Sequence, residues 1–590
     1  MKTRYLLWSL IRFRFWVYLL LIVGWLLTYT MPLLGGEMLR RFMDSFTSNT
    51  TLSWGNALLL WLLISVIGPV LRPLIFFIEP LMTQATIALL TKNILLRLFA
   101  LPAVQALTVA SGDAVSRFRD DTREIGVFLI WSAVIFGRLL FACCAITIML
   151  SINALVTLIA LLPIAAMLVL NSVMMGRIQS YRQASRTATS EVATGISNIF
   201  QAIQAIKVAT AEASVIAHFR RLNERRRQVA LRERIYGEVL QSFFANTLNL
   251  VTGLIVLISA QIIAAGTLSV GTFLLFVFYA QFLMNCFSAF GMLIARYRQV
   301  ATSFERLGTL LQEAPLAELV ASSQTYLSGT LPSIEPVTIT PATRLKQLEV
   351  VNLSYQYPGT LRGISNITFQ IQPGTLTVIT GGIGSGKTTL LRVLLGLLPC
   401  SQGEIIWNEL SIEEPAAFLV PPRCAYTPQQ PHLFSGSIRD NILLGQPSDK
   451  QKIEQALDHA ILTPDLMTMR TGVETIIGPR GVRLSGGQIQ RVAAARMFTH
   501  PAELLLFDDL SSALDVETEQ ALWQRLTGKP DTTFLAVTQR RALLQRADNV
   551  LVLKDGMLIA QGTHSDLLAT CPEFQRLWHG ENRAFQDAQA

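Results

Sequence analysis

The distribution of apolar residues divides the chain into two parts. The first 300 or so residues contain long apolar runs, whereas from about residue 346 short alternating runs separated by turns are typical of a soluble α/β domain. A run of about 20 apolar residues is long enough to cross the hydrocarbon core of a bilayer. Six such runs are predicted as membrane spans, at about 15–34, 56–78, 126–150, 153–175, 242–265 and 271–295.

The stretches between these spans alternate in length and charge. The intervals 35–55, 151–152 and 266–270 are short and carry little positive charge, whereas 79–125 and 176–241 are long and rich in arginine. Because basic loops stay on the cytoplasmic side, both termini are predicted to be cytoplasmic. The two long intervals contain mostly helix-forming residues, so they are expected to continue the membrane helices into the cytosol.

Composition supports a membrane protein and excludes two other classes. Hydrophobic residues make up 51% of the chain and the mean hydropathy is +0.43, which is too apolar for a soluble protein. The net charge of +9 comes from arginines beside the spans, and no nucleic-acid-binding motif accompanies them. The first apolar run lacks a small-residue cleavage site, so it is expected to be retained rather than removed as a signal peptide.

One motif in the second part predicts a phosphate-binding loop. Residues 381–388 match G-x-x-x-x-G-K-[ST], between a predicted strand at 377–380 and a predicted helix that opens at Thr389. The residues of this loop are Gly381, Gly382, Ile383, Gly384, Ser385, Gly386, Lys387 and Thr388. Backbone N–H groups and the helix N-terminus would bind the phosphates of ATP. Lys387 would contact the β- and γ-phosphates, and the Thr388 hydroxyl would bind Mg²⁺.

Further motifs follow in an order that resembles the ATP-binding cassette (ABC) transporters. Residues 484–488 read Leu-Ser-Gly-Gly-Gln, that family's signature, and lie between the loop and a predicted strand that ends at Asp508. The resemblance implies that Asp508 and Gln429 help to hold Mg²⁺ and that Tyr357 stacks on adenine. It also implies that 512–515 form the D-loop, and that 111–121 and 191–212 form intracellular helices that dock on nucleotide domains. The signature residues expected to contact ATP are Ser485, Gly486, Gly487 and Gln488.

The resemblance covers the whole chain and implies a half-transporter. The expected domains are a six-helix α transmembrane domain of the exporter type (1–312), a linker (313–345), an α/β P-loop nucleotide-binding domain (346–582) and a tail (583–590). The signature is too far from the same chain's P-loop to share one phosphate. Family members pair head to tail, so a second half-transporter is the expected partner, in a membrane predicted to be the bacterial inner membrane.

Three positions depart from the family pattern. Asp509 stands where a catalytic Glu is usual, Gln539 stands where the switch His is usual, and Pro479 replaces a Glu before the signature. A misplacement of a catalytic group by about 1 Å can cost on the order of 100-fold in rate. Two interpretations follow: ordinary drift in a working homodimer, or a weakly hydrolytic site in a heterodimer whose partner carries the competent residues. The second pattern resembles one half of the antigen-peptide transporter.

Polar residues inside the predicted spans allow two interpretations. Arg72, Glu79 and Arg138 lie in the second and third spans, and Gln281 and Asn285 form an i,i+4 pair in the sixth. Buried charge in a membrane faces a cavity or a partner charge. The residues could line a pathway for a polar or anionic substrate, or could pair between helices, for example Arg138 with Glu79. The sequence predicts ATP-driven export of a substrate it does not name; import through the same fold and an ATP-gated channel are the alternatives.

Overall fold

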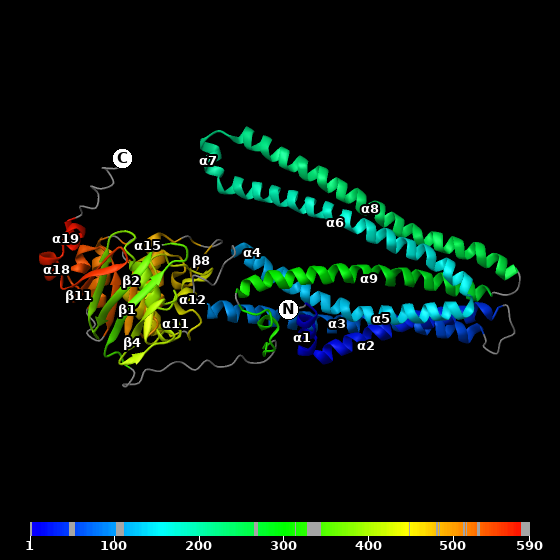
Figure 1. The fold of residues 1–590 in the computed structure, drawn as a ribbon, viewed down its shortest axis with the longest axis horizontal. Coiled ribbons are helices and arrows are strands. Elements are labelled where there is room, and N and C mark those ends of the chain that lie inside the picture. The colour runs from blue at the N-terminus through cyan, green and yellow to red at the C-terminus, as the bar shows by residue number, and fades with distance from the viewer. Residues whose placement is uncertain are drawn as a thin grey trace. The chain divides into compact units, whose positions relative to one another are not determined.

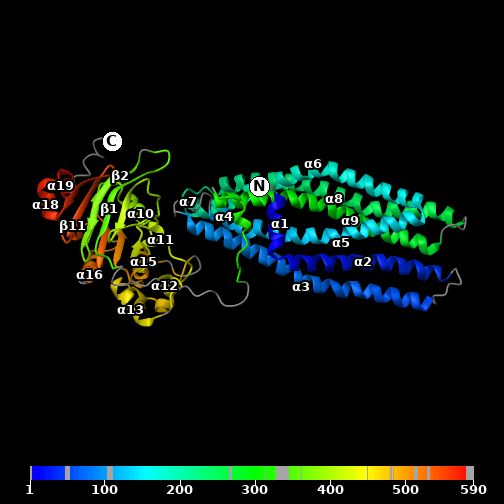
Figure 2. The same cartoon turned by 60° about the horizontal axis from the view of Figure 1, so that its bottom comes forward.

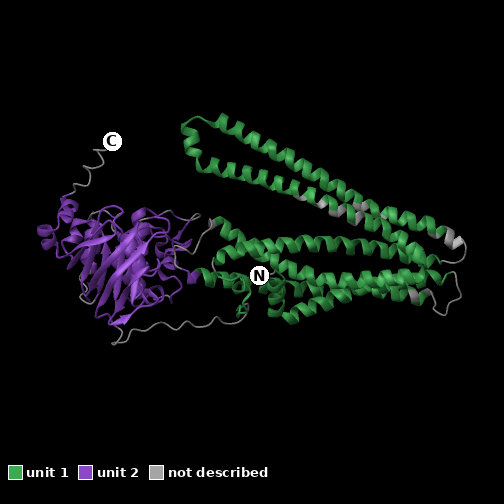
Figure 3. Cartoon of the chain, in the orientation of Figure 1, with its two compact units in different colours: residues 1–98, 108–330 green, residues 99–107, 331–590 purple. Residues whose placement is uncertain are grey.

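The structure of the protein is a computed structural model. It describes residues 3–46, 54–101, 111–264, 269–312, 314–326, 344–360, 362–447, 449–478, 482, 484–510, 514, 516–527 and 532–579. The chain forms two compact units, one of residues 1–98 and 108–330 and the other of residues 99–107 and 331–590 (Figure 3). Each unit is described by itself.

The described part of the first unit contains helices and no strand (Figures 1 and 2). Its elements are α1 (Thr3–Phe13), α2 (Phe15–Asp44), α3 (Trp54–Ala100), α4 (Ser111–Ser116), the π-helical turn η1 (Arg117–Asp121), α5 (Thr122–Ile152), α6 (Ala154–Gln201), α7 (Ile203–Val208), α8 (Glu212–Ala264), α9 (Val270–Leu311) and the short 3-10 turn η2 (Glu318–Val320). Asn153 ends α5 and caps α6, because its side chain accepts a hydrogen bond from the Val156 N–H at 3.1 Å.

Each of the six predicted spans falls on a different long helix of this unit; Asn153 precedes α6, and residue 265 lies outside the described residues. Four helical segments are long and apolar enough to cross a membrane: Phe15–Asp44, Leu58–Ala100, Gly112–Ile152 and Val270–Leu311. In the part of α6 and α8 that the structure describes, the apolar stretches are shorter, Ala154–Ala166 and Asn249–Ile258. The prediction that the basic interval 176–241 continues the helices is confirmed, since α6 and α8 pair along their length up to α7 (Figure 1). In the interval 79–125, α3 continues to Ala100 and α4 and η1 precede α5, whereas residues 102–110 lie outside the described residues.

The remaining long helices pack around α5. Helices α2, α5 and α9 contact one another, and their shared core contains Leu21, Leu129 and Leu307. Helices α2 and α5 approach closely at Gly137, where a Cβ atom would lie 2.5 Å from the Trp25 carbonyl oxygen. Only glycine fits there without moving a helix.

Part of the predicted linker packs against α3. The segment 314–326 buries Leu319 and Val320, and the Asn93 amide donates to the carbonyl oxygens of Leu319 and Ala321 at 3.0 and 2.9 Å. These contacts attach the start of the linker to the membrane unit. Residues 327–343 of the linker, and the tail 583–590, lie outside the described residues, so the domain boundaries stay a prediction.

The second unit contains a mostly parallel six-stranded sheet in the order β12-β11-β3-β10-β9-β6 and an antiparallel sheet in the order β2-β1-β4-β5. Only β12 of the six is antiparallel to its neighbour. The strands of these two sheets are β1 (Leu348–Gln356), β2 (Gly363–Ile371), β3 (Leu376–Gly381), β4 (Gln402–Trp407), β5 (Leu410–Ser411), β6 (Cys424–Thr427), β9 (Leu504–Asp508), β10 (Thr533–Val537), β11 (Asn549–Lys554) and β12 (Met557–Gly562). The two-residue strands β7 (Gly436–Ser437) and β8 (Ile476–Ile477) pair separately.

Neighbouring residues of the central strands point to opposite faces of the six-stranded sheet. In β9, Leu504 and Leu506 join the apolar core shared with the antiparallel sheet and α10 (Lys387–Leu394), whereas Leu505 and Phe507 join the core on the other side. Burial on both faces explains the continuous apolar runs. The helices on that other side are α12 (Ile438–Leu443), α13 (Lys450–His459), α14 (Thr463–Thr468), α15 (Gly486–Phe498), α16 (Val516–Thr527), α17 (Arg541–Leu544), α18 (His564–Thr570) and α19 (Pro572–His579). Helix α11 (Pro415–Phe418) lies beside the first core.

Candidate functional site

The carboxyl ends of four neighbouring parallel strands bring the predicted site residues together. Strand β10 lies between β3 and β9, and β6 follows β9. The P-loop follows β3, Gln539 follows β10, Asp508 ends β9 and Gln429 lies two residues past β6. Ligands bind at this edge of open α/β sheets. The fold therefore assembles one site from residues that are more than 150 positions apart in the chain.

The P-loop has the backbone geometry expected of a phosphate cradle. Gly386 is the N-cap of α10 with φ of +99°, and Gly381 has φ of +153° with no room for a Cβ beside the Leu553 carbonyl oxygen. Both conformations favour glycine. The Lys387 ammonium donates to the carbonyl oxygens of Gly381 and Gly382 at 3.0 and 2.7 Å. The cation is thus held over the loop, where a nucleotide phosphate would replace the carbonyl oxygens as its partner.

A cavity of about 580 Å³ adjoins this loop. It is lined on one side by Tyr357 and Arg362 and on the other by the residues from Gly384 to Thr389. The Tyr357 hydroxyl lies 3.3 Å from the Thr389 hydroxyl, and its ring packs edge-on against Tyr355 with the centroids 5.0 Å apart. An aromatic face beside a phosphate cradle suits a nucleotide, which has both a planar base and charged phosphates.

Asp508 and Thr388 fit a Mg²⁺ site. The Thr388 hydroxyl donates to Asp508 Oδ1 at 3.1 Å, and Oδ2 of the same carboxylate is buried with no hydrogen-bond partner among the described residues. Burial raises the pKa of Asp508 above its usual range. A bound cation would reverse this by favouring the ionised form. Mg²⁺ prefers hard oxygen ligands, and Thr388 and Asp508 supply a hydroxyl and a carboxylate oxygen.

Asp509 follows in a left-handed conformation, with φ of +52°, and its N–H donates to the Val537 carbonyl oxygen at 3.0 Å. Burial raises the pKa of its carboxyl group; nearby Arg540 and Lys387 and a hydrogen bond with the Gln429 side chain oppose that rise. The structure therefore places Gln429 beside Asp509. Arg540 was not predicted from the sequence as a site residue, because only tertiary contacts bring it to this carboxylate.

Gln539 reaches the P-loop directly. Its amide donates to the Gly381 carbonyl oxygen at 2.6 Å, so it shares that oxygen with Lys387. Burial lowers the pKa of Lys387, and the carboxylates of Asp508 and Asp509 oppose the change. An amide at this position can contact a phosphate oxygen but cannot carry an imidazolium charge.

The signature forms a second helix N-terminus. Ser485 caps α15, with its hydroxyl accepting from the Gln488 N–H at 3.3 Å and its own N–H donating to Gln488 Oε1 at 2.9 Å. The Gln488 amide and the Arg491 guanidinium hold Asp465 at 3.0 and 2.7 Å. This end of the helix is thus fixed by contacts with α14. Pro479 and residues 512, 513 and 515 of the predicted D-loop lie outside the described residues.

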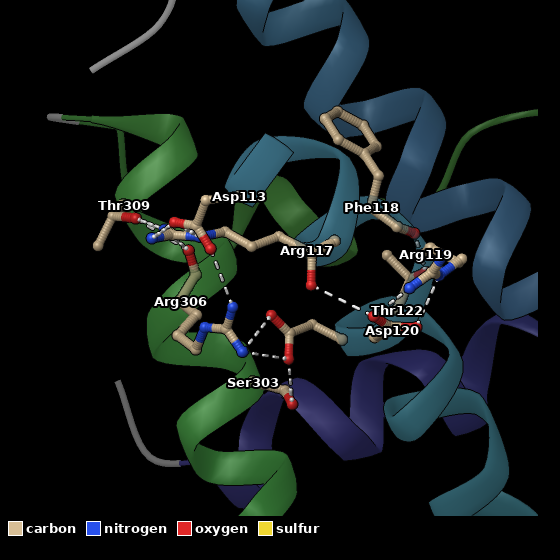
Figure 4. Close-up of polar contacts among 11 residues, drawn as sticks. Asp113, Arg117, Phe118, Arg119, Asp120, Thr122, Ser303, Arg306 and Thr309 are labelled. Carbon is tan, nitrogen blue, oxygen red and sulfur yellow. Dashed lines mark hydrogen bonds and ion pairs between the residues drawn. The ribbon is translucent and has the colours of Figure 1, made fainter. Parts of the chain in front are cut away.

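The segment that precedes α5 is tied to α9 by a polar network (Figure 4). Asp121, which is 6% exposed, accepts from the Ser303 hydroxyl at 2.9 Å and pairs with Arg306 at 3.4 Å. Arg306 also pairs with Asp113 at 3.2 Å, and Asp113 pairs with Arg117 at 2.6 Å. Asp113, Arg117 and Asp121 belong to the predicted first intracellular helix, and their polar groups face α9 of the same unit.

This network predicts a loss of stability when its cation is removed. Arg306→Gln leaves the buried Asp121 carboxylate without its ion pair; since Arg306 is 43% exposed, we expect a cost of about 1–2 kcal/mol and a melting temperature lower by a few degrees. Arg298→Gln is the matched control, because Arg298 is exposed on the same helix. The measurement is thermal unfolding of the full chain in nanodiscs. Equal shifts for the two variants would contradict a structural role for the network.

The polar residues inside the predicted spans have other partners than the ion pair suggested from the sequence. Arg138 donates to the Tyr29 hydroxyl at 2.6 Å and to the Asn285 carbonyl oxygen at 3.2 Å. The suggested ion pair with Glu79 is wrong for the residues that the structure describes. It failed because the Arg138 side chain contacts α2 and α9, whereas Glu79 is on α3. Arg72 packs over the Phe76 ring at 5.8 Å, and the Asn285 amide donates to the Gln281 carbonyl oxygen at 3.2 Å.

Comparisons with known proteins agree with this geometry. The chain matches the ABC transporter transmembrane region over residues 15–287 and the ABC transporter model over residues 364–512. An uncharacterized ABC transporter ATP-binding protein, YfiB of Bacillus subtilis, is 30% identical over 57% of this chain and 56% of that protein. The mycobactin import ATP-binding/permease protein IrtB of Mycobacterium tuberculosis is 30% identical over 55% of this chain and 54% of that protein. The chain thus matches about half the length of these curated relatives.

A solved structure extends the likeness to the whole fold. The structure of a bacterial Atm1-family ABC exporter with ATP bound aligns with a TM-score of 0.76, covering 97% of this chain and 98% of that one at 20% identity. The chain therefore belongs to the ABC transporters. It is a half-transporter, with an exporter-type membrane domain followed by one nucleotide-binding domain, and an integral membrane protein. The predicted family and fold class are confirmed.

Proposed function

We propose that this chain is one subunit of an ATP-driven exporter, situated in the bacterial inner membrane with both termini in the cytoplasm. The observation that carries the proposal is the convergence of the P-loop, Asp508, Asp509 and Gln539 at one sheet edge, in a chain that also contains long apolar helices. Mg-ATP would be held by Lys387, Thr388 and Asp508, with its base beside Tyr357. Import remains the second candidate, since one relative is named for mycobactin import.

We further propose that the subunit pairs with a different half-transporter. Three features of this chain's own site support weak hydrolysis. The carboxylate of Asp509 is one methylene shorter than the usual Glu; it is already engaged by Gln429 and faces Arg540; and Gln539 replaces the switch His. The signature helix, in contrast, is capped and fixed through Asp465. Such a chain can bind ATP at its own P-loop and complete a competent site on its partner.

In this arrangement the residues act as follows. Lys387 and the P-loop amides bind the β- and γ-phosphates, and Gln539 orients the loop through the Gly381 carbonyl group. The Ser485 hydroxyl and the N-terminal amides of α15 neutralise charge on the γ-phosphate bound by the partner. Mg²⁺ supplies further charge neutralisation when it is bound. Closure of the two nucleotide-binding domains on ATP would change the side of the membrane from which the membrane domains are accessible to substrate.

Trapping of nucleotide tests both parts of the proposal. The transporter is purified with its natural partner, incubated with photoreactive azido-ATP, Mg²⁺ and vanadate, and irradiated. With vanadate we expect label on the partner chain, because vanadate traps nucleotide only where hydrolysis occurs. Without trapping, at low temperature, we expect photolabel on both chains, because both bind ATP. Trapped label on this chain at equal intensity would contradict the weak site, and copurification of this chain only with itself would contradict the heterodimer. The absence of trapping on any chain would contradict ATP-driven transport.

A further inference from the structure

The membrane unit contains a row of cationic and aromatic side chains between α2, α5 and α9. We define the cationic lane as Trp131, Arg138 and Arg296. The Arg296 guanidinium lies 5.1 Å from the Trp131 ring centroid, and the Arg138 guanidinium lies 5.8 Å from it. Trp131 and Arg138 are seven residues apart on α5, so they share one face of that helix. Both arginines therefore contact the same indole.

The two arginines differ in how their charge is balanced. Arg296 pairs with Glu124 at 2.9 Å, at the cytoplasmic end of the predicted sixth span. Arg138 lies in the middle of the third span, and its contacts with the described residues are to neutral groups: the Tyr29 hydroxyl, the Asn285 carbonyl oxygen and two aromatic rings. No carboxylate pairs with Arg138 in the described part of the chain. An uncompensated cation at that depth is costly and marks a binding or transport site.

The position of Arg138 is set by a close helix contact. Its neighbour Gly137 lies against the Trp25 carbonyl oxygen and the Tyr29 ring, which lets α5 approach α2. The Arg138 Nε atom can then donate to the Tyr29 hydroxyl at 2.6 Å. The guanidinium is thereby oriented by its Nε and Nη1 atoms, whereas Nη2 has no hydrogen-bond partner among the described residues. A guanidinium with a free N–H donor can form a hydrogen bond with a planar acidic group such as a carboxylate.

We infer that the cationic lane binds the acidic group of an amphipathic organic anion. The inference rests on the proposed transport function and specifies the class of its substrate. A carboxylate, sulfonate or phosphate group would contact Arg138, and a planar apolar part of the same molecule would pack on the partly exposed indole of Trp131. Arg296, at the cytoplasmic end of the lane, would attract the anion toward Arg138 from that side.

Two dyes of nearly equal shape test the inference. Anilinonaphthalene sulfonate is an aromatic anion, and N-phenylnaphthylamine is the same ring system without the acid. The full transporter, with its partner, is placed in phosphatidylcholine nanodiscs, and energy transfer from tryptophan to dye is measured after subtraction of empty nanodiscs. The chain has nine tryptophans, so Trp131→Phe identifies the share of transfer that comes from the lane.

We expect saturable binding of the anionic dye to the unmodified transporter. Arg138→Gln should raise its half-saturating concentration on the order of tenfold, because a charge-assisted hydrogen bond is lost. Arg138→Lys should lie between the two, and the neutral dye should be unaffected. Arg123→Gln is the matched control, because Arg123 is exposed on the same helix α5. Trp131→Phe should lower the saturable transfer, and this variant leaves Arg138 unchanged; Trp25, beside Gly137, accounts for part of the transfer that remains.

The outcomes separate this inference from the transport proposal. Equal affinities of the anionic dye for the unmodified transporter and Arg138→Gln, an equal loss for the neutral dye, or the absence of saturable binding would each overturn the site. An unchanged transfer signal in Trp131→Phe would do the same. Vanadate trapping is measured on the same samples. If vanadate trapping is intact but the anionic dye does not bind, only the binding site at the cationic lane is contradicted. If trapping is absent, the proposed function itself is contradicted.

Discussion

Changing Ser485 to Arg is expected to abolish ATP turnover by the assembled transporter. Ser485 caps α15 and places its hydroxyl and the helix amides where the partner's γ-phosphate would lie. An arginine side chain would fill that anion pocket and remove the N-cap hydrogen bond to the Gln488 N–H. Loss of one such group in an oxyanion site costs about 100-fold or more in rate. The measurement is the ATPase rate of the purified complex at saturating Mg-ATP.

The matched variant at this chain's own site is Asp509→Asn. Its effect should be small, less than about threefold, because a catalytic carboxylate displaced by about 1 Å has already lost most of its contribution. The two variants thus discriminate between the assemblies. A homodimer has only one kind of site, so both changes would damage it. If Asp509→Asn alone abolishes activity, the proposal of a weak site at Asp509 is wrong and the homodimer is favoured.

Replacement of Lys387 by Ala should weaken ATP binding at this chain's site by on the order of 10- to 100-fold. Hydrogen bonds to a charged group contribute about 1.5–3 kcal/mol, and Lys387 is the cation that the structure holds over the P-loop. The measurement is photolabelling of this chain by azido-ATP in the full complex at low temperature.

Lys346→Ala is the control for this prediction, because Lys346 is exposed in the same domain and lies before β1. It should leave the labelling curve unchanged. Equal affinity of Lys387→Ala and the unmodified chain would contradict the assignment of the P-loop. Labelling of the partner chain, recorded in the same experiment, shows whether the complex remains assembled in each variant.

Local patterns predicted much of the nucleotide-binding domain. The P-loop motif predicted a strand and a helix, and the structure has β3 and α10 around it. The apolar run that ends at Asp508 is β9, and the signature is the first turn of α15. These elements depend on residues close together in the chain. Their roles at one nucleotide site were predicted from the family resemblance, whereas the strand order that brings them to one edge comes from the structure.

Contacts between distant segments could not be predicted in the same way. The sequence marked Arg138 as unusual but suggested Glu79 as its partner, whereas the structure supplies Tyr29 and the Asn285 carbonyl group. Arg540 at Asp509 and Arg306 at Asp121 were missed for the same reason. A long flexible side chain gives no local signal of its partner. Leu319, in the predicted linker, is likewise buried because its segment packs against α3, and the local sequence does not indicate this contact.

The close contact at Gly137 gives a way to sort relatives of this chain by substrate. A relative that keeps the arginine but has a larger residue before it must hold α2 and α5 further apart, because a Cβ would lie 2.5 Å from the Trp25 carbonyl oxygen. Its guanidinium would then lose the support of the tyrosine hydroxyl and present a different donor to a cargo. The adjacent pair Gly137-Arg138, rather than the arginine alone, is therefore the marker by which transporters of similar cargo should be grouped.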